Sequence, residues 1–292
     1  MKPLVRAALV LGLLLVVACF PKTIPPPPPQ PAKVAVVLGA GVSRGFAHVG
    51  VLKVLDAQKV PIHLIVGTSA GSFVGSIYAS GIDAFHVQKM ALAIQKDDVV
   101  DLTIPDNGFI RGEKLENFVN KAVQNVTIER LKIPFRAVAT NVQTGEEIVF
   151  VTGNTGKAVR ASCSMPGIFQ PVRIGDKTYV DGGLVSPVAV DAAKKAGADV
   201  VIAVDIAAGV ARTLPQGILE TILQSIDIMY VKIAAVQIRN AEVVIRPRVS
   251  HINSSDFDRR HEAILEGEKA AAEALPQIQQ ILNKLRREGR LP

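Results

Sequence analysis

A serine between two glycines is the first candidate for chemistry, in IVGTSAGSFVGSIYASG at residues 65–81. The segment GTSAG at 67–71 fits the pattern G-x-S-x-G, with an apolar run before it and helical spacing after it. In this pattern the serine lies on a sharp turn between a strand and a helix, where free amides and the helix dipole stabilise negative charge. We therefore expect Ser69 to be a nucleophile, with Gly67 and Gly71 allowing the two backbones to approach closely.

A nucleophilic serine needs a group that accepts its proton, and the sequence offers two kinds. His251 and His261 lie late in the chain, where the histidine of a Ser-Asp-His triad is expected. Neither follows an apolar strand at a small-residue turn, so we expect both at the surface. Asp181 ends a short apolar strand and precedes Gly182 and Gly183, which permit close backbone approach. The sequence favours Asp181 as the base, although an ordinary Asp-Gly β-turn has the same residues.

A second glycine cluster, VVLGAGVSRG at residues 36–45, also lies between an expected strand and an expected helix. It does not fit the dinucleotide fingerprint G-x-G-x-x-G, because Arg44 stands where the third glycine should be. The next strand also lacks the acidic residue of that fingerprint. The alternative is a turn of exposed amides that holds an oxyanion, with Arg44 near a phosphate or an anionic intermediate.

The elements that must position these residues alternate between strands and helices. Several strands are continuous apolar runs, which favours a largely parallel sheet covered on both faces, so we expect a three-layer αβα fold. We expect strands at 34–38, 64–66, 135–140, 148–151, 200–205 and 243–245, and helices at 46–58, 70–80, 83–94, 214–239 and 259–288, the last bent or broken at Pro276. The apolar stripe of helix 214–239 is typical of a core helix, and a lipid-facing role is the alternative.

The N-terminal residues predict export and anchoring. Lys2 and Arg6 precede an apolar stretch at 9–17 that is too short to span a bilayer. A small residue precedes Cys19, which resembles the lipobox of bacterial lipoproteins and implies cleavage before Cys19 and its acylation. An ordinary signal peptide with an incidental cysteine is the alternative. The proline run in KTIPPPPPQP, at 22–31, predicts an extended spacer of about 3.1 Å per residue.

Composition narrows the remaining classes of function. The chain has 292 residues, of which 49% are hydrophobic and 4% aromatic, and one domain accounts for that length. The net charge of +7 owes much to the basic end at 284–290. That end is either a solvated helix terminus or a surface for anionic lipid, and an exported protein meets little nucleic acid. With Cys19 acylated, Cys163 is unpaired and is expected to be a buried, inert thiol. No spacing indicates a metal site.

The glycine clusters and the Asp-Gly-Gly segment occur together in the order found in the patatin-like phospholipases. The sequence resembles that family from residue 33 to about residue 272. Five segments carry the resemblance: GAGVSRGFAHVGVLKVL, VGTSAGSFVGSIYASG, VRASCSMPGIFQPV, YVDGGLVSPVAVDAAKKAGADVVIAVDI and SSDFDRRHEAILEGEKAA. Five segments in a consistent order are far more specific than either glycine cluster alone.

The resemblance implies a catalytic dyad of Ser69 and Asp181 without a histidine. It places Gly41 and Val42 where the family has backbone donors to the oxyanion, and Arg44 at the position of its basic residue. The family usually has three glycines where this chain has AGV at 40–42. Backbone amides survive that substitution, but valine tolerates a positive φ poorly, so we expect a hole of altered shape.

The activity implied is that of a lipid acyl hydrolase of the phospholipase A, lysophospholipase or esterase type, acting through an acyl-enzyme without a cofactor. An acyltransferase with the same dyad, or a catalytically silent scaffold, is the alternative. The expected organisation is a signal peptide at 1–18, a lipidated cysteine and proline-rich linker at 19–32, and a patatin-like hydrolase domain at 33–292. We expect the protein in a bacterial cell envelope, held to a membrane and facing the periplasm or the exterior.

Overall fold

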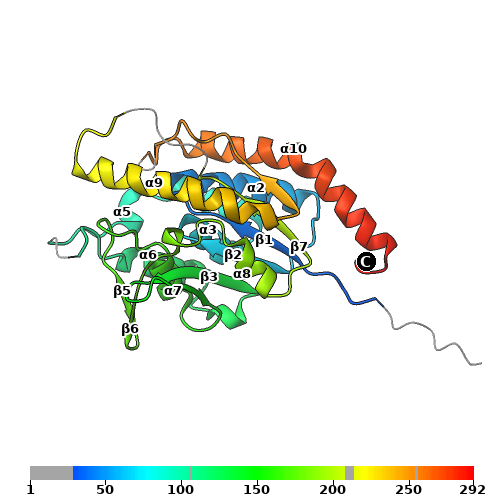
Figure 1. Cartoon of the computed structure of the whole chain (residues 1–292), viewed down its shortest axis with the longest axis horizontal. Coiled ribbons are helices and arrows are strands. Elements are labelled where there is room, and N and C mark those ends of the chain that lie inside the picture. The colour runs from blue at the N-terminus through cyan, green and yellow to red at the C-terminus, as the bar shows by residue number, and fades with distance from the viewer. Residues whose placement is uncertain (1–28, 105–106, 208–213, 254–255) are drawn as a thin grey trace, which may run out of the picture.

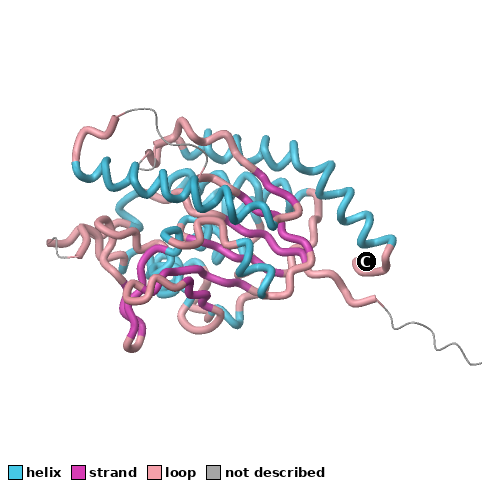
Figure 2. Tube along the Cα trace, viewed as in Figure 1, coloured by secondary structure: helices cyan, strands magenta, loops and turns pink. Residues whose placement is uncertain are grey.

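The computed structural model describes residues 29–104, 107–207, 214–253 and 256–292. The expected signal peptide, Cys19 and most of the proline-rich linker lie outside the described residues. The rest of the chain forms one sheet with helices on both of its faces (Figure 1, Figure 2).

The sheet is mainly parallel, as the apolar strands predicted. Its order is β5-β6-β3-β2-β1-β7-β8, and β4 also pairs with β3. Neighbours from β3 to β8 are parallel, and the pairs of β3 with β4, β3 with β6 and β5 with β6 are antiparallel. The strands are β1 (Val34–Leu38), β2 (Leu64–Thr68), β3 (Phe135–Asn141), β4 (Glu147–Phe150), β5 (Val172–Ile174), β6 (Lys177–Asp181), β7 (Val200–Val204) and β8 (Val243–Ile245).

Alternate residues of β1 belong to two different cores, which defines three layers. Val36 packs in one core together with the helices α2 (Phe46–Ala57) and α10 (Arg260–Arg287). Val37 packs in the other core with α8 (Val190–Lys195) and α9 (Ile218–Gln237). Both faces of this central strand are fully buried, so a continuous apolar run is what such a strand needs. The three-layer αβα prediction is confirmed.

The remaining helices close the same end of the sheet. They are α3 (Ala70–Ala79), α4 (Ala84–Ala93), α5 (Lys96–Val99), α6 (Glu113–Ala122) and α7 (Thr155–Ser162), with short 3-10 turns η1 (Val42–Gly45), η2 (Ile128–Arg130), η3 (Gly182–Leu184) and η4 (Ile238–Asn240). The outer helices α2 and α10 approach until their backbones touch. A Cβ atom added at Gly50 would lie 2.0 Å from the Ile264 carbonyl oxygen, and one at Gly267 would lie 2.0 Å from that of Ala47.

The two C-terminal helices differ from the expectation in their details. Helix α9 begins at Ile218 rather than at residue 214, because Gly217 has an extended backbone and Pro215 precedes it. Helix α10 continues through Pro276 without a break, and Figure 1 shows its C-terminal half turning away from the sheet. The loss of one backbone hydrogen bond at a proline bends a helix without ending it when packing holds both sides.

The apolar stripe of α9 is only partly a core stripe. Ile226 and Tyr230 are buried against the sheet, whereas Ile218 is 84% exposed and Val236 is 59% exposed. By length and composition alone, the segment Glu220–Asn240 is long and apolar enough to cross a membrane. Its packing on the second core makes it one layer of this fold.

Candidate active site

Ser69 lies at the junction of β2 and α3, in the strained turn that the sequence predicted. Its backbone has φ 53° and ψ −123°, a region that residues other than glycine seldom adopt. A Cβ atom at Gly71 would lie 2.0 Å from the carbonyl oxygen of Leu38, and one at Gly67 would lie 2.5 Å from Ser72. Only glycine at these two positions lets α3 start so close to the sheet.

Strand register brings the serine and the aspartate together. Thr68, the last residue of β2, pairs with Val138 of β3, and the next residue of β3, Ala139, pairs with Asp181 of β6. The two functional side chains therefore follow neighbouring rungs of the sheet. Ser69 Oγ donates a hydrogen bond to Asp181 Oδ2 at 2.6 Å. This direct contact between hydroxyl and carboxylate is the geometry of a dyad.

The carboxyl group of Asp181 is completely buried and receives three hydrogen bonds. Besides Ser69, the backbone N–H of Gly183 donates to Oδ1 at 2.7 Å and the hydroxyl of Tyr230 donates to Oδ1 at 3.0 Å. Burial raises the pKa of Asp181 to about 6, while the three donors lower it in part. A carboxylate with that pKa is a stronger base than an exposed aspartate and is still ionised at neutral pH.

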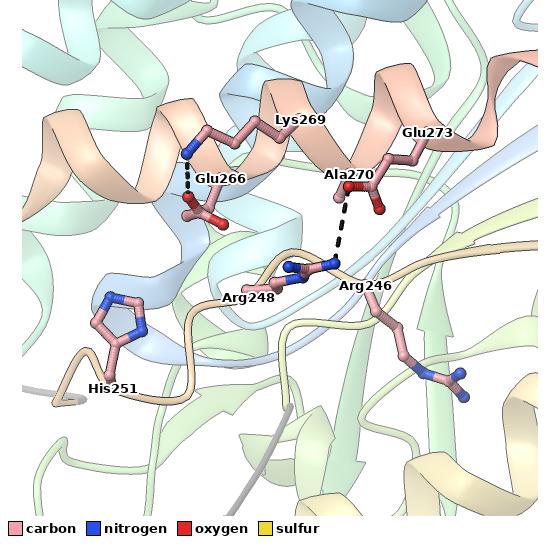
Figure 3. Close-up of a pocket in the computed structure, with 7 residues that line it drawn as sticks. All are labelled: Arg246, Arg248, His251, Glu266, Lys269, Ala270 and Glu273. Atoms are coloured by element: carbon pink, nitrogen blue, oxygen red, sulfur yellow. Dashed lines mark hydrogen bonds and ion pairs between the residues drawn. The ribbon is translucent and has the colours of Figure 1, made fainter.

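Neither late histidine belongs to this site. His251 is half-exposed, and its Nε2 lies 2.6 Å from Glu262. Figure 3 shows it at one side of a separate charged hollow of about 270 Å³, where Lys269 pairs with Glu266 and Arg248 with Glu273. His261 is exposed on α10. Both histidines are on the surface, as the sequence predicted.

The loop before η1 is shaped as an anion site. Gly41 has an extended backbone, and Val42 has φ 50°, the positive value that valine tolerates poorly. Among the residues that the structure describes, no acceptor takes a hydrogen bond from the N–H of Gly41 or of Val42. Val42 and Ser69 line the same cavity. These amides are the candidate donors to an oxyanion.

A buried histidine fixes the start of this loop. His48 of α2 is completely buried and its Nε2 lies 2.8 Å from the carbonyl oxygen of Gly39. Because a carbonyl only accepts, Nε2 carries the proton. Burial lowers the pKa of His48 to about 4, so the ring stays neutral at ordinary pH. Sequence analysis did not single out His48, although it lies inside the first family segment.

Arg44 does not point into the site, and its expected role beside an anion is not what this geometry supports. The side chain is 2% exposed and does not line the cavity. Its two terminal nitrogens bond Asp227 of α9 at 3.0 and 3.3 Å, and Nε donates to the carbonyl oxygen of Ile252 at 2.9 Å. A buried carboxylate within reach of a guanidinium is a stronger partner than a distant substrate. The sequence could not show that α9 would supply that carboxylate.

An apolar cavity of about 400 Å³ opens from Ser69, within the usual range of roughly 300–1,000 Å³ for small-molecule sites. Six of the ten phenylalanines of the chain line it, and Lys96 is the one charged residue among its described lining residues. The phenylalanines are Phe46, Phe73, Phe109, Phe118, Phe169 and Phe257. Such a lining excludes water and accepts a hydrocarbon chain.

The segment after α7 supports the dyad from below. Ser162 Oγ accepts a hydrogen bond from the Ser69 N–H at 2.9 Å and donates to the carbonyl oxygen of Val138, and Asp181 N donates to the Ser164 carbonyl oxygen at 2.8 Å. Cys163 is buried at the cavity wall. Burial and the Asp181 carboxylate raise the pKa of its thiol, which agrees with an inert cysteine.

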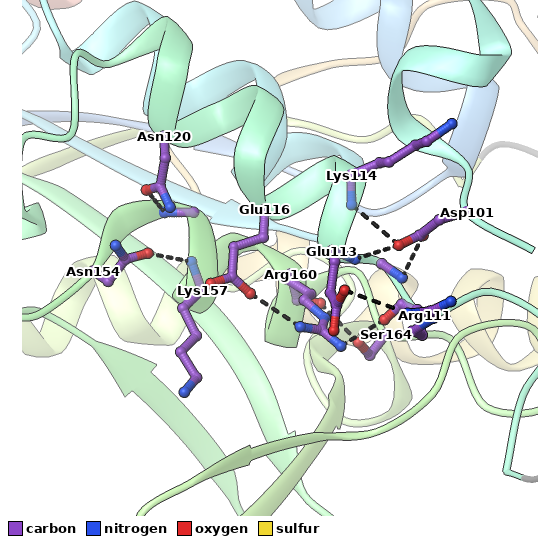
Figure 4. Close-up of polar contacts among 12 residues, drawn as sticks. Asp101, Arg111, Glu113, Lys114, Glu116, Asn120, Asn154, Lys157, Arg160 and Ser164 are labelled. Atoms are coloured by element: carbon purple, nitrogen blue, oxygen red, sulfur yellow. Dashed lines mark hydrogen bonds and ion pairs between the residues drawn. The ribbon is translucent and has the colours of Figure 1, made fainter. Parts of the chain in front are cut away.

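Polar contacts between α6 and α7 hold this segment in place, as Figure 4 shows. Arg160 of α7 pairs with Glu116 of α6 at 3.1 Å and donates to the carbonyl oxygen of Arg111. Asp101 accepts from the backbone N–H of Gly112 at 2.7 Å, at the start of α6. Ser164 Oγ then bonds the carbonyl oxygen of Arg160 at 2.8 Å. The chain is thus fixed on both sides of Cys163.

Comparison with known proteins agrees with the dyad geometry. A family model described as patatin-like phospholipase matches residues 36–194, more than half of the chain. The chain belongs to the patatin-like phospholipase family. A solved patatin-fold neighbour, VipD from Legionella pneumophila, superposes with a TM-score of 0.62 over 85% of this chain and 67% of that chain, at 12% identity. That likeness concerns the fold.

Family relatives share only part of their length with this chain. An uncharacterised NTE family protein of Mycobacterium tuberculosis is 36% identical over 60% of this chain and 49% of its own length. Lysophospholipase NTE1 of Coccidioides immitis is 35% identical over 63% of this chain and 12% of its own. Human patatin-like phospholipase domain-containing protein 6 is 33% identical over 59% of this chain and 13% of its own. The chain therefore spans about half, or much less, of these relatives.

Proposed function

We propose that this protein is a serine hydrolase that cleaves acyl esters of lipids, with Ser69 as nucleophile and Asp181 as general base. The observation that carries the proposal is the 2.6 Å hydrogen bond between the two side chains at the wall of an apolar cavity. Hydrolysis of a lipid ester needs a basic carboxylate, a nucleophile and a dry place for the acyl chain, and this site offers all three.

The mechanism follows from these contacts. Asp181 Oδ2 takes the proton while Ser69 Oγ bonds to the ester carbonyl carbon, and the oxyanion lies against the amides of Gly41 and Val42. Asp181 then returns the proton to the leaving alcohol as the ester bond breaks, which gives an acyl-enzyme. Water, deprotonated by Asp181, attacks that acyl group and releases a fatty acid and the free Ser69 hydroxyl.

A substrate with one long acyl chain fits the site best. The cavity is almost entirely apolar, and a hydrocarbon chain buried there gains about 0.8 kcal/mol for each methylene. One fungal relative is named a lysophospholipase, the activity expected of such a site. We therefore propose a lysophospholipid or a similar monoacyl ester as the substrate class.

Labelling with a fluorophosphonate tests the assignment. The wild-type protein should form an adduct on Ser69, and Ser69→Ala should form none. Asp181→Asn should slow labelling by about 100-fold or more, because general-base assistance contributes roughly 10²–10⁴-fold. His251→Ala and His261→Ala serve as matched controls and should label at the wild-type rate.

The outcomes separate the alternatives. Loss of labelling in either histidine variant would indicate a triad. A folded wild-type protein that forms no adduct would be a silent scaffold. Product analysis with a lysophospholipid, with and without an added alcohol acceptor, distinguishes hydrolysis from acyl transfer.

We also propose that acylated Cys19 ties the domain to a membrane of a bacterial cell envelope. Supporting this, the first described residues are fixed where a tether would exit, since Ala32 N donates to the Arg290 carbonyl oxygen at 2.8 Å and Arg290 donates to that of Gln30. The basic end of α10 thus lies beside the tether. Cys19→Ala should move the protein from the membrane fraction to the soluble fraction, whereas Cys163→Ala should not.

A further inference from the structure

Two side chains one turn apart on α9 reach the reaction machinery. Tyr230 donates its hydroxyl proton to Asp181 Oδ1 at 3.0 Å. Asp227 accepts from the guanidinium of Arg44 at 3.0 and 3.3 Å. Residues at positions i and i+3 share one face of a helix, so both contacts come from the face that α9 turns towards the sheet. Helix α9 lies beyond residues 36–194, the part that the family model matches.

Tyr230 decides which carboxylate oxygen faces the nucleophile. Asp181 Oδ1 receives both the Tyr230 hydroxyl and the Gly183 N–H, which leaves Oδ2 for Ser69. The ring of Tyr230 is 1% exposed and packs directly on the turn after Asp181, because a Cβ atom at Gly183 would lie 2.2 Å from it. A rigid aromatic ring on a long helix holds the carboxylate in one rotamer.

Asp227 acts on the other half of the site. Its partner Arg44 belongs to η1, two residues after Val42, whose amide is a candidate oxyanion donor. Arg44 is buried and also bonds the Ile252 carbonyl oxygen, and Ser43 Oγ donates to the Asn253 carbonyl oxygen at 2.8 Å. The loop is therefore held from α9 and from the chain that follows β8. A movement of α9 would shift the base and the amides together.

We propose that Tyr230 and Asp227 are positioning residues, through which α9 holds the base and the oxyanion loop in register for the reaction. The inference depends on the function proposed above and adds to it an element outside the matched family region. Neither residue contacts the ester in this scheme. Each acts through a partner, Tyr230 through Asp181 and Asp227 through Arg44.

Tyr230→Phe tests the first contact. Loss of the hydroxyl donor removes stabilisation of the ionised carboxylate, so the pKa of Asp181 should rise. The titratable groups that face Asp181 are Tyr230 on α9 and Cys163 after α7, with Asp227 one turn from Tyr230. Burial keeps that tyrosine and that cysteine protonated. The acidic limb of kcat/KM should therefore move up by about one pH unit, the size of one hydrogen bond to a charged group.

Tyr78→Phe is the matched control. The Tyr78 hydroxyl donates to Asp56 at 3.3 Å, outside the dyad, and Tyr78 does not line the cavity. Its pH profile should coincide with that of the wild type even where its melting temperature falls. A purely structural role for Tyr230 predicts equal behaviour of the two variants, and identical acidic limbs would overturn the proposal for Tyr230.

Asp227→Asn and Arg44→Lys test the second contact. Each should lower kcat by about 10-fold to 100-fold with KM little changed, because a displaced oxyanion donor weakens only the transition state. The acidic limb should stay in place in both variants. The double variant should lose no more activity than either single one, since the two residues act through each other. Additive losses, or a loss confined to KM, would overturn this part.

The two proposals fail separately. Fluorophosphonate labelling of the wild-type protein is measured first, and absence of a Ser69 adduct counts against the hydrolase itself. If the wild type labels and hydrolyses a monoacyl ester, an unchanged pH profile in Tyr230→Phe counts only against the role of α9.

Discussion

The carboxyl group of Asp181 is enclosed by protein, and its three hydrogen-bond donors only partly replace water. Its pKa therefore rises from 3.8 to about 6. A raised pKa in the folded state means that the fold is most stable where the acid is protonated and loses stability as the pH rises through that value. The same burial that strengthens the base in the proposed mechanism weakens the fold at neutral pH.

Asp181→Asn should therefore be more stable than the wild type at pH 8. The shift from 3.8 to about 6 corresponds to an upper limit of about 3 kcal/mol in the free energy of unfolding. The gain should shrink to roughly half at pH 5, because the wild-type acid is then mostly protonated in the folded protein. Urea unfolding at the two pH values measures it.

Asp176→Asn, the same change at an exposed turn, is the control and should leave stability unchanged at both pH values. A variant at position 181 that is less stable than the wild type at pH 8 would contradict the prediction. The three donors would then bind the carboxylate more strongly than burial penalises it.

Val42 has a positive φ of 50°, which costs an L-residue roughly 1–2 kcal/mol. Val42→Gly removes that strain, whereas Val42→Ala keeps it and loses a similar apolar side chain. We expect the glycine variant to be the more stable of the two by about 0.5–1 kcal/mol, after allowance for the greater freedom of glycine in the unfolded chain.

Thermal unfolding of both variants checks this expectation. The same pair of changes at Val74, inside α3, should give the opposite order, with glycine about 1 kcal/mol worse than alanine. Equal order at both positions would mean that Val42 carries no strain.

At the scale of elements, the crossing of α2 and α10 depends on two glycines. A Cβ atom at Gly267 would lie 2.0 Å from the carbonyl oxygen of Ala47, which is backbone and cannot move aside alone. Gly267→Ala should therefore separate the helices and destabilise the protein by about 2 kcal/mol or more, at or above the usual cost of overpacking. Chemical denaturation measures the loss.

Ala272→Ser provides the comparison, because it adds one heavy atom on the exposed side of the same helix. Only a few tenths of a kcal/mol, the difference in helix propensity, should be lost there. If Gly267→Ala costs no more than this control, the helices have room that the packing does not indicate.

Elements with strong periodicity could be predicted from the sequence, and weakly patterned ones could not. The expected strand at 34–38 is β1 itself, and the expected helix at 46–58 is α2 to within one residue. Helix α7 has eight residues and depends on a cap, since Asn154 accepts from the Lys157 N–H at 2.7 Å. The β5–β6 hairpin, with strands of three and five residues, was expected only at its end near Asp181. Such short elements are stable through tertiary contacts that a periodicity count does not register.

The candidate site divides in the same way. Ser69 and Asp181 are marked by glycine patterns, because a close backbone approach leaves a trace in the sequence. Tyr230 lies in an apolar stripe that gives no sign of its hydroxyl partner, and Arg44 gives no sign that Asp227 lies 183 positions later. Contacts between distant elements are decided by the packing of layers, which the sequence expresses only as hydrophobicity.

At the scale of the whole molecule, the helices between β2 and β3 serve mainly to enclose the cavity. Helices α3, α4 and α6 contribute lining residues, and Phe73 stacks on Phe118 at 5.7 Å between ring centroids. The fold thus spends its few aromatic residues on a compartment beside the dyad. Longer acyl chains should be hydrolysed more efficiently until the cavity is full, by roughly fourfold in kcat/KM for each buried methylene at about 0.8 kcal/mol.

Ala91→Phe should shorten that compartment. Ala91 of α4 lines the cavity, and a phenyl ring at this position occupies space that several methylenes would otherwise fill. The ratio of kcat/KM for a long-chain ester to that for a butyrate ester should fall by about 10-fold or more, equivalent to two or more methylenes. Ala93→Phe, two residues away on the exposed side of α4, should leave the ratio as it is in the wild type. A ratio that does not change in Ala91→Phe would mean that the acyl chain lies elsewhere, and the apolar cavity would then have no part in choosing the substrate.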